Sequence, residues 1–169
     1  MALRTALAIV VAAYLTLASG CFRPLSAPSP TRHPPPTPYT LRYPPWAVDS
    51  MHFPIAPYDN PLTVEGIALG RRLFYEPALS RDHDLSCGSC HLQAHAFSDP
   101  ERYSQGIEGQ QGARNAMALV NLAWNHFFFW DARALTLELQ AFEPVRDHRE
   151  LFNSWPEIIH RLRERPGYD

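Results

Sequence analysis

The chain has 169 residues, 15 of them basic and 17 acidic, which gives a net charge of −2. This length predicts one domain together with segments that are removed or remain unfolded. All of the basic residues are arginines, and they form no stripe interleaved with aromatic residues. The composition therefore argues against a nucleic-acid partner.

The first twenty residues have the pattern of an export signal. Arg4 supplies a positive charge, and residues 6–17 form an apolar run that is too short to span a bilayer. Cys21 follows small residues at the cleavage point, as in lipoprotein signals, whose cysteine is lipidated and becomes the new N-terminus. An ordinary secretory signal followed by an incidental cysteine is the alternative. We expect a periplasmic chain that is anchored to a membrane by lipid.

Proline dominates residues 21–57, which contain eleven of the 17 prolines. The run Pro34–Pro36 and its neighbours can form neither a helix nor an interior strand. We therefore expect an extended linker that holds the following domain, residues 58–169, away from the membrane surface. Trp46 and Phe53 are candidates for contacts between this linker and the domain.

Apolar residues recur at helical spacing in three segments of the domain. The first helix is predicted to begin at Thr63, a suitable N-cap, and to stop at Pro77. The second is predicted to span residues 134–142 and to end at Pro144, because proline interrupts the hydrogen bonds of a helix interior.

A capping box marks the start of the third predicted helix. Ser154 stands three residues before Glu157, and apolar residues follow on one side until Pro166. The segment 96–115 is rich in Gly, Ser, Asp and Gln and has no hairpin signal or sustained alternation. The sequence therefore predicts an all-α fold.

Residues 87–91 read Cys-Gly-Ser-Cys-His, the C-x-x-C-H attachment signature of c-type haem. Two thiols one helical turn apart can each add to a vinyl group on one edge of the porphyrin, and the next imidazole can reach the iron. A thioredoxin-like redox pair would need a βαβ context, and half of a zinc site would need a second ligand pair. We therefore predict one covalent haem c, attached through Cys87 and Cys90 and ligated by His91.

Further segments accompany the haem motif in a fixed order between residues 60 and 151. They are Asn60–Thr63, Leu69–Phe74, Leu79–Ser80, Leu85–His91, Phe97–Asp99, Gly106, Gly112, Arg114–Asn115, Asn121, Phe129–Arg133 and Leu137–Gln140. Together they resemble the N-terminal domain of the bacterial di-haem cytochrome c peroxidase family, which includes MauG-type enzymes. The resemblance implies a cytochrome c-like haem domain.

Members of that family have two haem domains, of which the N-terminal one reacts with peroxide and the C-terminal one relays electrons. The resemblance implies an oxidoreductase that reduces hydrogen peroxide with electrons from a small cytochrome, a cupredoxin or a second haem. Trp130 matches the residue that conducts electrons between the haems, and Gln140 and Glu150 match the polar pair above the peroxidatic iron. Asn115 matches a residue near a calcium ion at the domain interface, so calcium is a further expectation.

The chemistry of peroxide cleavage supports these roles. A base must take a proton from the near oxygen and return it to the leaving one, and a partly buried glutamate beside an amide suits that task. Glu150 lies ten residues beyond Gln140, across a turn, so the two side chains could converge. A solvated surface acid beside Arg149 is the alternative for Glu150. For Trp130 the alternative is a core aromatic next to the phenylalanines 127–129.

Ile107 departs from the family pattern, because many members have a histidine at this place that caps the resting iron. Its replacement resembles MauG-like members and predicts a high-spin iron that is accessible to peroxide. His83 and His148 are expected to be exposed, and His95 is too close to His91 in sequence to reach the opposite face of the haem easily. His126 could reach that face in principle, and the alternative is a histidine at the surface or behind the iron ligands.

Two more departures concern Ala132 and the end of the chain. Ala132 stands where the family has glycine, which is tolerable in a helical or extended backbone and costly if φ is positive. The sequence stops at Asp169, where relatives continue into a second haem domain, and it holds no second C-x-x-C-H motif. We expect a truncated product or a fragment that lacks its internal electron donor.

Two rival functions remain beside the peroxidase. One is a non-enzymatic monohaem electron carrier with Met117 as a sulfur sixth ligand, since methionine ligation raises the potential. The other is a MauG-like oxidant of a partner protein. A ferric spectrum that responds to peroxide would favour the peroxidase, and a low-spin spectrum that does not respond would favour the carrier.

Overall fold

The computed structural model describes residues 34–44, 47 and 57–168. The chain divides into two compact units, 1–35 and 36–169, and all the helices below belong to the second. The predicted signal peptide, Cys21, Trp46 and Phe53 lie outside the described residues. No described helix has the length and apolar character needed to cross a membrane.

Helix α3 (Val64–Phe74) begins at the predicted residue. The Thr63 hydroxyl accepts a hydrogen bond from the Gly66 backbone N–H at 3.0 Å, which satisfies one of the free donors at the helix start. The helix ends shortly before Pro77, and a 3-10 turn, η2 (Pro77–Leu79), follows. The first predicted helix is therefore confirmed.

Helix α5 (Leu137–Arg146) differs from the second prediction at both ends. Ala134 lies outside it because its backbone bonds to the preceding loop, and Thr136 is the N-cap. Pro144 lies inside the helix rather than at its end, so the prediction that it stops the helix was wrong. Continuing past the proline places Val145, which is 3% exposed, in the core, and this burial offsets the hydrogen bond lost at the proline.

Helix α6 (Trp155–Arg163) has only half of the predicted capping box. The Ser154 hydroxyl accepts a hydrogen bond from the Glu157 backbone N–H at 3.4 Å. The Ser154 backbone N–H instead donates to Asn153 Oδ1 at 2.8 Å. The Glu157 carboxylate bonds Arg161 at 2.7 Å, one turn further along the helix, because the i and i+4 side chains share a face.

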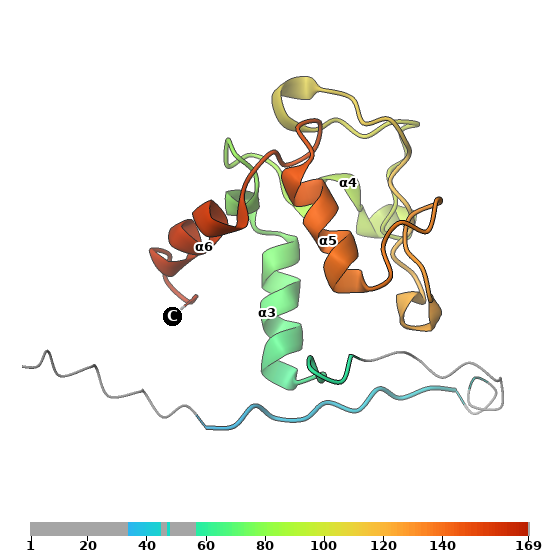
Figure 1. Ribbon diagram of the computed structural model, residues 1–169, viewed down its shortest axis with the longest axis vertical. Helices are drawn as coiled ribbons and strands as arrows, with labels where there is room; N and C mark the ends of the chain where they lie inside the picture. Colours follow the sequence, from blue (N-terminus) through green and yellow to red (C-terminus); the bar gives the residue numbers. More distant parts are fainter. Residues whose placement is uncertain (1–33, 45–46, 48–56, 169) are drawn as a thin grey trace, which may run out of the picture. The chain divides into compact units, whose positions relative to one another are not determined.

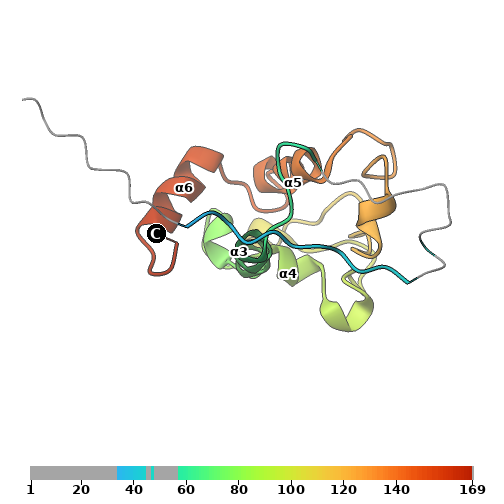
Figure 2. The same cartoon turned by 90° about the horizontal axis from the view of Figure 1, so that it is seen from below.

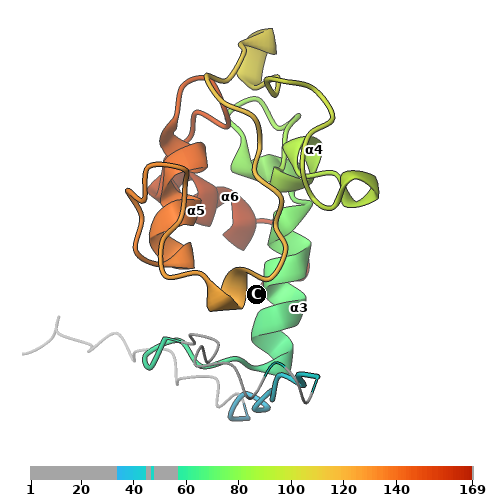
Figure 3. The ribbon, with the colours of Figure 1, turned by 90° about the vertical axis from the view of Figure 1, so that its right-hand side faces the viewer.

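The remaining helical elements are short. They are α4 (Cys87–Cys90), η3 (Gln93–His95), η4 (Ile107–Gly109) and η5 (Leu122–Trp124). The described residues contain no strand, only isolated bridges, so the all-α class is confirmed. Figure 1 shows α3 between α6 and α5, and Figures 2 and 3 show α3 and α4 on one side with α5 on the other.

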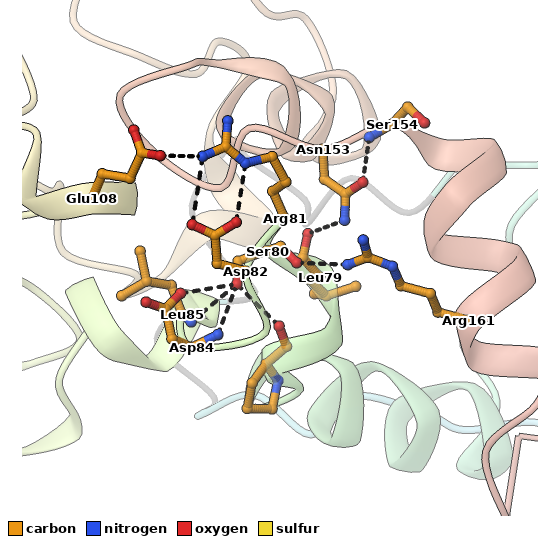
Figure 4. A network of polar contacts seen from close by, with 11 residues as sticks. Leu79, Ser80, Arg81, Asp82, Asp84, Leu85, Glu108, Asn153, Ser154 and Arg161 are labelled. Atoms are coloured by element: carbon orange, nitrogen blue, oxygen red, sulfur yellow. Dashed lines mark hydrogen bonds and ion pairs between the residues drawn. The ribbon is translucent and has the colours of Figure 1, made fainter.

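The core joins η2, α5 and α6. Its buried members are Leu79, Val145, Leu151 and Ile158, which are each at most 5% exposed. Polar contacts fix the same elements from outside, as Figure 4 shows: Arg161 donates to the Ser80 carbonyl at 2.9 Å, and Asn153 donates to the Leu79 carbonyl at 3.1 Å. Helix α6 is thereby held against η2.

Part of the proline-rich segment is bonded to the domain. Pro38 forms an isolated bridge with Thr63, and the Thr37 backbone N–H and hydroxyl each donate to the Glu65 carboxylate at 2.8 Å. Further along, the rings of Tyr43 and Trp124 meet edge to face at 5.7 Å between centroids. Residues 37–44 therefore follow the surface of the second unit rather than leaving it directly.

Candidate functional site

A cavity of about 520 Å³ lies between α4 and α5, within the size range of small-molecule and cofactor sites. The residues predicted to attach and use a haem all line it, although they come from segments far apart in the sequence. They are Cys87, Cys90, His91, Trp130, Gln140 and Glu150. The fold therefore brings the local haem motif and the distant polar pair to one place.

Helix α4 holds the two thiols one turn apart. Its start is closed by Ser86, whose backbone N–H donates to the Ser89 hydroxyl at 3.0 Å. Cys87 packs against the core cluster, and Cys90 lies within 4.0 Å of the Gln105 carbonyl. Burial raises the pKa of both cysteine thiols above the usual value, so they remain protonated at neutral pH.

His91 follows directly as the C-cap residue of α4. Its Nδ1 donates a hydrogen bond to the Phe97 carbonyl at 2.9 Å, because a carbonyl oxygen can only accept. This bond places the proton on Nδ1 and leaves Nε2 with a lone pair for a metal. Ala96 and Phe97 both have a φ of +56°, and this strained left-handed turn is what directs the Phe97 carbonyl toward the imidazole.

The cavity fits a haem by the chemistry of its walls. Phe74, Leu85 and Leu119 supply apolar surface for a porphyrin, and Arg133 offers a cation for the propionates. The Ser104 hydroxyl oxygen is buried on this wall and has no hydrogen-bond partner among the described residues. A bound group that carries polar atoms would satisfy it.

Glu150 borders the cavity, where part of its side chain stays exposed. Removal from bulk water by the surrounding protein raises the pKa of its carboxyl, and the nearby Asp147 carboxylate raises it further. Arg149 and Arg133 act in the opposite direction without cancelling the rise. A carboxyl with a raised pKa holds its proton more readily than a free glutamate, which suits a group that accepts and returns a proton. Because Glu150 remains exposed, the alternative of a surface acid stays open.

Gln140 is half-buried in α5 and lines the same cavity as Glu150. Trp130 also lines it but is 82% exposed, so it is not the core aromatic considered as the alternative. That position belongs to Phe128, which is 8% exposed. Trp130 thus connects the cavity wall with the protein surface.

The backbone around Trp130 is unusual. Phe129 and Ala132 have φ values of +65° and +55°, and the Arg133 guanidinium lies 3.4 Å from the centroid of the Phe129 ring. Asp131 accepts bonds from Arg114 at 3.0 Å and Arg133 at 2.8 Å. Ala132 therefore adopts the conformation in which its replacement of glycine is costly.

Asn115 lines the cavity and holds the preceding loop in place with two hydrogen bonds. Its side-chain nitrogen donates to the carbonyls of Asp99 at 3.2 Å and Glu101 at 2.7 Å. The described residues include no cluster of three or more His, Cys, Asp or Glu side chains suited to a metal ion. The calcium site expected at Asn115 stays a prediction. Met117, the sulfur ligand of the rival carrier, lines the cavity as well.

Histidines other than His91 are absent from the described residues that line the cavity. Ile107 is fully buried in the domain, and its backbone N–H donates to the Glu150 carbonyl at 2.9 Å. His83 and His148 are exposed, as expected, and His95 and His126 are exposed as well. The residues that sequence reasoning missed are Phe97, Ser104 and Gly106, although Phe97 and Gly106 stand within the matched segments.

Comparisons with known proteins agree with this site. Residues 64–169 match the model of a family described as di-haem cytochrome c peroxidase. Methylamine utilization protein MauG of Methylorubrum extorquens is 39% identical over 112 residues, which is 66% of this chain and 32% of the relative. Cytochrome c peroxidase Ccp of Escherichia coli is 37% identical over 111 residues, which is 65% of this chain and 24% of the relative.

A solved structure is similar in fold as well as sequence. It is described as a MauG-like protein associated with microbial copper homeostasis, and it matches with a TM-score of 0.64 and 38% identity. The match covers 68% of this chain and 35% of that one. The chain thus spans between about a quarter and a third of the length of these relatives.

Proposed function

The chain belongs to the di-haem cytochrome c peroxidase family, and from this premise we propose that it is a haem c-dependent oxidoreductase that reduces hydrogen peroxide. The observation that carries the proposal is the convergence of the attachment residues with Glu150 and Gln140 on one cavity. An electron carrier would need the haem ligands alone. A proton-transfer group beside them is what peroxide cleavage requires.

Cys87 and Cys90 would hold the haem through thioethers, and His91 Nε2 would ligate its iron, since Nδ1 is engaged with the Phe97 carbonyl. When bound, haem c supplies a redox-active iron. The protein around it supplies orientation and proton transfer. Reduction of one peroxide to two water molecules consumes two electrons and two protons.

Glu150 is the proposed proton carrier. Its raised pKa suits a group that takes the proton from one peroxide oxygen and returns it to the other as the oxygen–oxygen bond breaks. The Gln140 amide would donate a hydrogen bond that orients peroxide beside it. Trp130, on the wall and at the surface, would pass the electrons inward from a small cytochrome, a cupredoxin or a second haem domain.

We place the mature chain in the periplasm, held to a membrane by a lipid on Cys21 and spaced from it by the proline-rich residues that follow. The bonds of residues 37–39 to the start of α3 support a linker that is held against the domain at that point. Radiolabelled palmitate incorporation into the wild type and Cys21→Ser would test the anchor, and equal labelling would contradict it.

The test of the peroxidase uses the full chain, matured with haem in a bacterial periplasm. Peroxide should change the ferric absorption and EPR spectra, and Glu150→Gln should slow that reaction by about 10²–10⁴-fold because the proton carrier is lost. Glu157→Gln is the matched control, since this glutamate lies on α6 outside the cavity. A wild-type spectrum that is indifferent to peroxide would refute the proposal.

Met117 supports a second candidate, because a methionine on the cavity wall is the side chain that an electron carrier would use as its sixth ligand. That function predicts a low-spin ferric spectrum in the wild type that Met117→Ala converts to high spin. The peroxidase predicts a high-spin spectrum in both proteins. The exposure of Trp130 favours a third candidate, oxidation of a partner protein at the surface, which would appear as peroxide-dependent modification of that partner.

A further inference from the structure

Among the described glycines, Gly106 is the one at which an added Cβ would come closest to another atom, and that atom belongs to the backbone. A Cβ atom at this position would lie 1.8 Å from the Arg149 carbonyl oxygen and 2.9 Å from the Glu150 Cα. Both neighbours are backbone atoms, which cannot swing aside as a flexible side chain can. The loop at Gly106 can therefore press against the chain at Glu150 only because residue 106 has no side chain.

Ile107 makes the bond that this approach permits. Its backbone N–H donates to the Glu150 carbonyl at 2.9 Å, and its side chain is fully buried, so it cannot move independently of the core. Figure 4 shows how the same loop is held from outside by the ion pair of Arg81 with Glu108, whose nitrogen and oxygen are 2.7 Å apart. The Arg81 backbone N–H also donates to the carbonyl of Leu151, the residue after Glu150.

The other side of Glu150 is held by the end of α5. The Glu150 backbone N–H donates to the Asp147 carbonyl at 3.0 Å, and the Leu151 N–H donates to the Pro144 carbonyl at 3.1 Å. Asp147 in turn accepts bonds from Arg149 at 2.9 and 3.2 Å. The Glu150 backbone is therefore fixed on both flanks, while its side chain borders the cavity.

We propose that Gly106 and Ile107 are positioning residues that set where the Glu150 carboxylate stands on the cavity wall. This inference rests on the proposed function, in which Glu150 carries the proton. Neither residue touches the reacting atoms; each acts through the backbone of Glu150. A displacement of about 1 Å in a catalytic group can lower a rate by about a hundredfold. Loss of the contacts that fix the Glu150 backbone should therefore have a measurable effect.

The charged groups around Glu150 come from the end of α5, from the residues just after it and from the loop that precedes this helix. Asp147 and Glu143 raise the pKa of its carboxyl, and Arg149 and Arg133 lower it, while removal from bulk water is the largest contribution. Moving the backbone changes the distance to each of them. A displaced Glu150 therefore differs in its titration as well as in its reach.

The test uses cyanide as the probe with the haem-loaded full chain, because hydrogen cyanide must also lose its proton when it binds ferric iron. The association rate constant is measured against pH for wild type, Glu150→Gln, Gly106→Ala and the double variant. Gly70→Ala is the control, since a Cβ there meets no atom within 4 Å. Hydrogen exchange of the Ile107 amide reports directly on its hydrogen bond to the Glu150 carbonyl.

We expect Gly106→Ala to slow cyanide binding by about tenfold or more, to shift the midpoint of its pH profile and to speed exchange at Ile107. In the Glu150→Gln background the same substitution should add little, because both act through one group. Full additivity, or a Gly106→Ala protein that behaves like Gly70→Ala, overturns the positioning role. A Glu150→Gln protein that binds cyanide like wild type overturns the proton-carrier role instead.

Ile107→Val provides the same test if Gly106→Ala does not assemble with haem. The change removes one methylene from a fully buried side chain and keeps the backbone N–H, so the domain should still fold. We expect about a threefold slower cyanide association and a shifted pH midpoint, and both should vanish in the Glu150→Gln background. Cyanide association and a pH midpoint equal to those of wild type would overturn the positioning role.

Discussion

Replacing Ala132 by glycine should stabilise the domain, whereas the same substitution in a helix should destabilise it. Ala132 has a φ of +55°, in the left-handed region that costs a residue with a Cβ roughly 1–2 kcal/mol. Glycine removes that cost but adds about 0.4–1 kcal/mol of unfolded-state entropy. The net gain is about 0.5–1 kcal/mol, or about 2–5 °C in Tm for a domain of this size.

Thermal unfolding of the haem-loaded chain, followed by circular dichroism, measures this difference. Ala68→Gly, at an exposed position inside α3, is the matched control and should lose about 0.5–1 kcal/mol. Ala96→Gly, where φ is +56°, should gain as Ala132→Gly does. Loss of stability in all three variants would refute the reasoning, because it would mean that neither alanine is strained.

Three further predictions concern the core, a partly buried ion pair and the linker. Ile158→Ala, at 1% exposure, should cost about 2–5 kcal/mol in denaturant unfolding, and Ile159→Ala, at 45%, far less; equal losses would contradict the core assignment. Burial alone would raise the pKa of Glu76, but its hydrogen bonds, including that from Arg165, outweigh it. The stability that Glu76 contributes is therefore present above the usual glutamate pKa and lost as pH falls through the lowered one, and Glu76→Gln should flatten the acid limb of stability against pH. Glu65→Ala should speed hydrogen exchange at the Thr37 and Tyr39 amides, and unchanged exchange would contradict the linker contact.

Local chemistry made much of the fold predictable. The N-caps Thr63 and Ser154 mark their helices correctly because a side-chain oxygen bonds the helix start within three residues. Pro144 misled the prediction, since the cost of proline inside α5 is offset by the burial of Val145, which only the folded chain reveals. Tertiary packing outweighed local propensity there.

The candidate site also has one part that the local sequence predicts and another that depends on the folded chain. Cys87, Cys90 and His91 form a contiguous motif, and their spacing alone indicates a haem. The place of Glu150 on the same wall depends on the loop at Gly106, more than forty residues earlier, so the residues alone could not decide it. A resemblance to known proteins supplied the expectation, and the fold supplies its physical reason.

Residues other than glycine with a left-handed backbone conformation were the hardest features to predict from the sequence. Phe97 directs its carbonyl to His91 from a φ of +56°, a conformation that its residue type disfavours. No pattern of polarity or spacing predicts such a turn, because the surrounding contacts impose it. Such strain occurs at Phe129, on the cavity wall, and at Phe97, whose carbonyl bonds the proposed iron ligand.

Covalent attachment of the cofactor is tested most directly by intact mass of the chain produced with a c-type cytochrome maturation system. We predict that the wild type gains the mass of one haem, which survives denaturation because two thioethers hold it. The variant in which Cys87 and Cys90 are both alanine should have the mass of the polypeptide alone. A wild-type chain without that added mass would contradict the assignment of this cavity as a haem site.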